Sequence, residues 1–163
     1  MTAYDLAEWH DQFVMVGGAA AALAGLIFVA VSLNHEHILR VPVLPSLAAQ
    51  TLGLLIGLVL LSVIALTPGQ SRIVVGSETA GLGGASFVFV TAANLRTGAH
   101  DIRRWWTISR LLLGAVATIP TIAGGVTLLA EAGGGLYWLS VEVIAAMLVT
   151  VYYAWILLIE IRR

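Results

Sequence analysis

The stretch FVMVGGAAAALAGLIFVAVSL, from Phe13 to Leu33, carries no charge and has the length of a membrane-crossing helix. Roughly 20 helical residues, at about 1.5 Å of rise each, cover about 30 Å, which is the thickness of a bilayer's hydrocarbon core. Four more stretches of that length hold at most one charged residue each, at residues 46–67, 73–95, 108–130 and 136–159. The sequence therefore predicts an all-α bundle of five transmembrane helices, with residues 1–163 forming one integral membrane domain.

The composition agrees with this prediction. Hydrophobic residues make up 60% of the chain and charged residues 10%, which is too little polar material to coat a water-soluble globule. The chain has no cysteine, which excludes disulfides, thiolate metal sites and thiol catalysis. An enzyme would need a nucleophile, a base or a metal cluster at the membrane surface, and apart from a weak histidine pair the sequence offers none. We therefore expect a protein that is not an enzyme and that has no cofactor.

The arginines predict the orientation. All eight basic residues are Arg, and five crossings place seven of them on one side and only Arg72 on the other. Since positive residues concentrate in cytoplasmic loops, we expect the C-terminus inside and the N-terminus outside, in the cytoplasmic membrane of a bacterial cell. The N-terminal segment carries Asp5, Glu8 and Asp11 but no basic residue, so it lacks the positive region of a cleavable secretory signal.

Residues 2–12 are predicted to form a short interfacial helix that leads into the first span. Thr2 has the spacing of a helix cap before Asp5, and Leu6, Trp9 and Phe13 recur at helical spacing. The segment is either an aromatic anchor at the lipid boundary, which we favour, or an outward lid or docking surface.

Two lines of small residues predict close helix packing. Gly17, Ala21 and Gly25 recur at intervals of four in the first span, and a second line in the third span consists of Gly76, Ala80 and Gly84. Small residues at this spacing let two helix backbones approach closely in lipid. The contact can lie within one chain or between copies.

Glu78 and Glu142 are the leading candidates for a functional site. Each lies about six residues into its span from the outer side, and each occupies the second helix of a predicted hairpin. A carboxylate in hydrocarbon costs several kcal/mol unless it is protonated, paired or reached by water, as at proton and cation sites. The alternative is a structural role near the outer headgroups, with Arg72 helping to neutralise Glu78. The parallel placement suggests two like-oriented repeated units.

Pro120, in the middle of the fourth span, deletes one backbone hydrogen bond and is predicted to bend that helix as a hinge or a fixed kink. Thr118 and Thr121 stand beside it and can help to satisfy the break. The remaining polar residues of the spans are scattered, and ordinary interhelical hydrogen bonds can satisfy them: Gln50, Ser62, Ser86, Thr91 and Asn94.

Two features are expected at the inner surface. A basic and aromatic cluster should contact lipid headgroups, and it consists of Arg103, Arg104, Trp105 and Trp106. His35 and His37 are weak candidates for a metal site, because ligands two residues apart diverge at a helix end, and solvated histidines are the favoured interpretation.

Several segments carry a family resemblance. The segment Trp9–Asn34, with Phe28-Val29-Ala30 and Ser32-Leu33-Asn34, resembles a widespread family of small uncharacterised bacterial integral membrane proteins, and the turn Pro68-Gly69-Gln70 and the segment Gly135–Trp138 are similar to members of it. Some members of that family are labelled modulators of a membrane-bound ATP-dependent protease. The resemblance implies a membrane protein over nearly the full chain, but no functional residues, because the shared motif is a packing pattern.

These observations favour a non-enzymatic, structural or regulatory membrane component that acts through helix packing as a homo-oligomer. Its partners are then the lipid bilayer and further copies of itself. The alternative is a small channel or carrier that moves a proton or a monovalent cation through Glu78 and Glu142. Nucleic acid is excluded as a partner, because the basic patch is short, lies against the bilayer and belongs to a chain of net charge −1.

Overall fold

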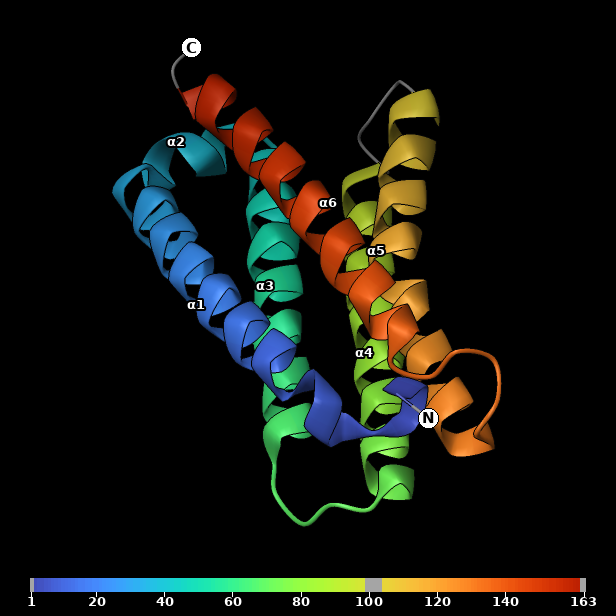
Figure 1. Ribbon diagram of the computed structural model, residues 1–163. Coiled ribbons are helices and arrows are strands. Elements are labelled where there is room, and N and C mark those ends of the chain that lie inside the picture. The colour runs from blue at the N-terminus through green and yellow to red at the C-terminus, as the bar shows by residue number, and fades with distance from the viewer. Residues whose placement is uncertain (1, 99–103, 162–163) are drawn as a thin grey trace.

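The structure, a computed structural model, describes residues 2–98 and 104–161 and is helical throughout its regular elements (Figure 1). Five helices are long and apolar enough to cross a membrane, as predicted. They are α1 (His10–Leu33), α3 (Leu44–Leu66), α4 (Arg72–Gly98), α5 (Arg104–Ala130) and α6 (Tyr137–Ile161), and the short α2 (His35–Arg40) links the first two. The all-α prediction is confirmed, whereas the orientation of the termini stays a prediction.

The four helices α3, α4, α5 and α6 form a ring in which each packs against two neighbours, because α6 returns to α3. The helix α1 stands outside this ring and packs along α3, as Figure 1 shows on the left. Only 11% of its most apolar window is buried, against 50% for α3. Most of the surface of α1 therefore faces lipid or a partner, whereas α3 is the central helix of the bundle.

The core of the bundle has two apolar clusters. One lies near the end that carries the N-terminus and centres on Phe13, Leu61 and Leu128. The other continues toward the end that carries the C-terminus, around Leu54, Leu58 and further buried residues of α1, α3 and α6. The exposed remainder of the helices is also apolar, as expected for a surface that lipid covers.

The N-terminal segment forms two short 3-10 turns, η1 (Thr2–Tyr4) and η2 (Leu6–Trp9), and not the single interfacial helix of the prediction. The residue that caps η2 is Asp5, whose side chain accepts a hydrogen bond from the Ala7 N–H at 3.0 Å, so the predicted cap at Thr2 is wrong. The Trp9 ring packs edge-on against Tyr137 at 5.0 Å between centroids. The segment is thus attached to the start of α6.

Three consecutive glycines allow this attachment. Gly133, Gly134 and Gly135 connect α5 to α6 with φ of +86°, +111° and +49°, a region that residues with a Cβ rarely adopt. Leu136 N–H donates to the Ala3 carbonyl at 2.8 Å, and Gly134 N–H donates to the Tyr4 hydroxyl at 3.2 Å. A Cβ at Gly135 would collide with the Ala3 carbonyl oxygen, so the docking of the N-terminal segment requires glycine there.

Candidate functional site

The predicted packing line on α1 is divided between two environments. A Cβ at Gly17 would lie 3.0 Å from Ser62 Cβ on α3, so Gly17 belongs to the contact between α1 and α3. Ala21 is exposed, and no atom lies within 4 Å of a Cβ built at Gly18 or Gly25. The face formed by Gly18, Ala21 and Gly25, called the outer face of α1 below, has no partner among the described residues.

The predicted line on α4 is largely buried against α5. A Cβ at Gly76 would lie 3.1 Å from the Gly125 carbonyl oxygen, and a Cβ at Gly125 would meet backbone atoms of Gly76 and Ala80. Gly84 does not take part, since nothing lies within 4 Å of a Cβ built there. Its neighbour Gly83 replaces it, with a Cβ position 2.8 Å from the Ile122 nitrogen. The contact therefore follows Gly76, Ala80 and Gly83.

Glu142 lies inside the bundle. Its side chain is only 6% exposed, and it shares a hydrogen bond with Thr121 of α5. Its Oε2 atom is buried and has no hydrogen-bond partner in the part of the chain that the structure describes. The same face of α6 continues with further buried residues, among them Ala146, Thr150 and Tyr153. A buried carboxyl group with an unmatched oxygen is the arrangement that a bound proton or cation would satisfy.

Glu78 has a different environment. Its side chain is exposed and accepts a hydrogen bond from Gln70 Nε2 at 3.2 Å. Arg72 does not neutralise it, as the sequence suggested, because Arg72 forms an ion pair with Glu131. Since α6 packs chiefly on α5 and α3, the structure does not bring Glu78 and Glu142 into one site. The two hairpins thus place their acids differently, which does not support a functional repeat.

A polar cluster at the other end of the bundle was not predicted as a site. Arg110 of α5 is only 4% exposed, and its Nη2 donates to Ser46 Oγ of α3 at 2.9 Å. Tyr153 of α6, which is fully buried, lies beside this guanidinium. The sequence interpretation used Arg110 only as a marker of orientation. Its contacts with Ser46 of α3 and Tyr153 of α6 place it in the interior of the bundle.

Two amides extend this cluster to α4. Gln50 Nε2 donates to Asn94 Oδ1 at 3.1 Å and to Ser46 Oγ at 3.0 Å. Asn94 Nδ2 in turn donates to the Arg110 carbonyl at 3.4 Å. The prediction that Gln50 and Asn94 form interhelical hydrogen bonds agrees with this geometry, but the two belong to one network and are not scattered. Their shared depth in the membrane is the sequence signal that could have grouped them with Arg110.

Helix α5 runs through Pro120 without ending. The Thr118 hydroxyl donates to the Gly114 carbonyl at 2.8 Å, and Thr121 is engaged with Glu142. Neither threonine therefore bonds the Val116 carbonyl, which Pro120 leaves without its helical donor. A hinge at Pro120 stays a prediction.

The two features predicted for the inner surface have separate outcomes. Arg103 lies outside the described residues, as do the side chains of Arg104 and Trp106, while Trp105 is 78% exposed. His35 and His37 lie in the first turn of α2, and within residues 2–98 and 104–161 no group of three or more metal-binding side chains comes together.

Comparison with known proteins does not assign the chain to a family. No family model, curated protein or solved structure matches the chain. The family resemblance therefore stays a prediction, and the functional argument depends on the geometry described above.

Proposed function

We propose that the chain is a non-enzymatic, structural or regulatory component of the bacterial cytoplasmic membrane, and that it acts as a homo-oligomer whose copies meet through α1. The observation that carries this proposal is the outer face of α1, formed by Gly18, Ala21 and Gly25, which is exposed on the least buried span of the bundle.

Lipid alone does not drive two helices together. In a bilayer there is no hydrophobic driving force between helices, so association depends on how closely two backbones approach. Small side chains permit that approach, and the Gly76–Gly125 contact between α4 and α5 shows that this chain already uses it internally. A second copy offers the outer face of α1 a matching surface, since symmetric dimers pair the same patch with itself.

A crosslinking experiment tests this contact directly. The chain has no cysteine, so Gly25→Cys introduces a single thiol, and we expect oxidation in native membranes to give a disulfide-linked dimer. The double variant Ala21→Leu and Gly25→Leu should lower the oligomer fraction in mild detergent. Gly17→Leu is unsuitable, because that side chain would collide with Ser62 inside the chain.

Gly81→Leu is the matched control, because Gly81 of α4 is likewise exposed with nothing within 4 Å of a Cβ. The control should keep the wild-type oligomer distribution. A protein that stays monomeric in membranes, or that loses oligomers equally in both leucine variants, would contradict the proposal.

A second candidate function is a proton or cation carrier, and the buried Oε2 atom of Glu142 favours it. Unlike the carrier expected from the sequence, this one would use Glu142 without Glu78, which is exposed. Purified protein in liposomes should then move protons or monovalent cations, and Glu142→Gln should abolish the flux. Glu78→Gln serves as the matched control and should leave the flux unchanged. Equal flux in wild type and Glu142→Gln would exclude this function.

A further inference from the structure

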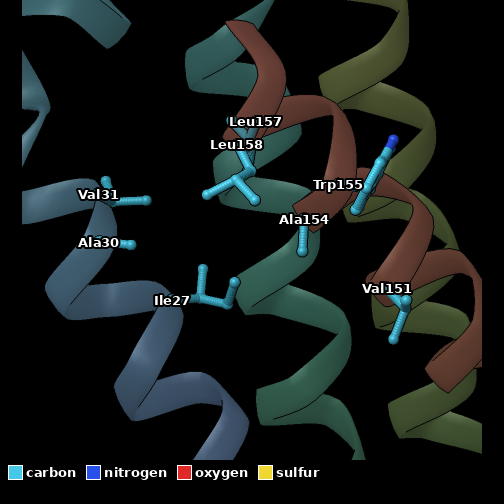
Figure 2. A pocket seen from close by; sticks show the side chains of 8 residues that line it. All are labelled: Ile27, Ala30, Val31, Val151, Ala154, Trp155, Leu157 and Leu158. Carbon is cyan, nitrogen blue, oxygen red and sulfur yellow. The ribbon is translucent and has the colours of Figure 1, made fainter. Parts of the chain in front are cut away.

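An apolar groove runs between α1 and α6 near the end of the bundle that carries the C-terminus. Its volume is about 300 Å³, and every residue that lines it is apolar: Ile27, Ala30, Val31, Val151, Ala154, Trp155, Leu157 and Leu158. Figure 2 shows Ile27 and Val31 pointing from α1 toward the facing residues of α6. The groove exists because α1 and α6 both pack on α3 and only weakly on each other.

The length of the groove fits one hydrocarbon chain. From Val151 to Leu158 the helix rises about 10 Å, while half of the hydrocarbon core measures about 15 Å. The groove thus covers most of one leaflet and stops at the corner where α1 meets α2. A packed helix from another protein would instead need a contact that continues along several turns.

A polar hollow lies at that corner. It has a volume of about 420 Å³ and is lined by residues of the α1–α2 corner, among them Asn34, His35 and Arg40. The Asn34 side chain donates to the Ala30 carbonyl at 2.8 Å, and Ala30 lines the groove. Ala30 and Val31, which line the groove, are followed directly in the chain by Ser32 and Leu33, which line the hollow, so one elongated molecule can reach both.

The positive charge of Arg40 in the hollow indicates that the bound molecule has an anionic headgroup. Arg40 is exposed and forms no ion pair with any described residue. The nearby acid Glu36 therefore leaves the guanidinium available, and five N–H donors in a planar fork suit a phosphate group. An arginine near a membrane surface attracts anionic lipid by about 1 kcal/mol.

We propose that this combined site binds one anionic phospholipid, with an acyl chain in the groove between α1 and α6 and its phosphate at Arg40. The inference goes beyond the proposed self-association, because Gly25 and Ile27 are two residues apart and so point to nearly opposite sides of α1. The lipid site and the contact between copies use different faces.

Native mass spectrometry of the delipidated protein tests the site. We expect one phosphatidylglycerol molecule to bind in preference to phosphatidylcholine. The double variant Ala30→Phe and Ala154→Phe fills the groove and should remove this tight binding. Arg40→Gln should keep the binding of both lipids but lower the preference for phosphatidylglycerol by about five-fold, the factor that corresponds to about 1 kcal/mol.

Ala49→Phe is the matched control, because Ala49 lines a separate apolar groove between α3 and α4 and the substitution is the same. The control should bind phosphatidylglycerol as the wild type does. All variants should keep the helical content of the wild type, since Ala30 and Ala49 are exposed and Ala154 is only half-buried at the wall of the groove. The proposal is overturned if the groove-filling variant binds the lipid as tightly as the control, or if it loses dimers while it keeps the lipid.

Discussion

A single methyl group at Gly125 should destabilise the bundle measurably. A Cβ there would lie 2.7 Å from the Gly76 carbonyl oxygen and 2.8 Å from Ala80 Cα, and closer still to the Ala80 nitrogen. These are backbone atoms, so no side-chain rotation relieves the contact, and Gly125→Ala forces α4 and α5 apart.

The size of the effect follows from two opposing contributions. Overpacking of a buried contact costs about 1–3 kcal/mol, and a collision with backbone belongs at the upper end. Replacing glycine by alanine within a helix stabilises the helix by about 1 kcal/mol. The net loss is therefore about 2 kcal/mol, which lowers the ratio of folded to unfolded protein by roughly 30-fold.

The assay is reversible unfolding in mixed micelles with increasing dodecyl sulfate, followed by tryptophan fluorescence. Gly81→Ala is the matched control on α4, because Gly81 is exposed and a Cβ there meets nothing within 4 Å. It should be as stable as the wild type or more stable by up to about 1 kcal/mol. If Gly125→Ala were as stable as Gly81→Ala, the close approach of α4 and α5 would be refuted.

Three further predictions concern other parts of the molecule. Asn94→Leu should lower the free energy of unfolding by about 1–3 kcal/mol in the same assay, because it removes the acceptor that the buried Gln50 amide has on α4, whereas replacing both amides by leucine should cost less than the sum of the two single changes. Tyr4→Phe removes the acceptor of the Gly134 N–H and should speed hydrogen exchange of that amide, at a cost of about 1 kcal/mol at most. A cysteine in place of Asp5 should react in intact cells with a thiol reagent that does not cross membranes, and protection of that cysteine would reverse the predicted orientation.

The five spans were predictable because length and apolar character alone determine them. Each long helix lies within a few residues of its predicted range; α3, for example, was expected at 46–67 and is found at Leu44–Leu66. The short α2 was missed, since six residues around His35 and Arg40 carry no periodic pattern long enough to detect. The glycine-rich turn after α5 was found, but its docking with Ala3 depends on residues far apart in the sequence.

The rotation of each helix about its axis was much harder to predict. In a water-soluble protein a polar face marks the outside, but here both the lipid-facing and the buried faces are apolar, so periodicity gives little information. Gly83 and Gly84 illustrate the consequence: they differ by about 100° around α4, and only Gly83 contacts α5. For the same reason the sequence did not reveal that Gly17 is packed against α3 while Gly25 is exposed.

Rotation also separates the two acids, which the sequence places at equal depth. Depth determines the cost of a carboxylate in lipid, but only rotation determines whether the group faces the interior. One signal did distinguish them: Glu142 is followed on its own face by Thr150 and Tyr153, at eight and eleven residues, both of which are buried. Polar side chains in a span tend to gather on the face that turns toward the interior, because exposure to hydrocarbon is costly for each of them. Such a polar stripe on one span is therefore better evidence for an interior site than the matching depth of two acids on different spans.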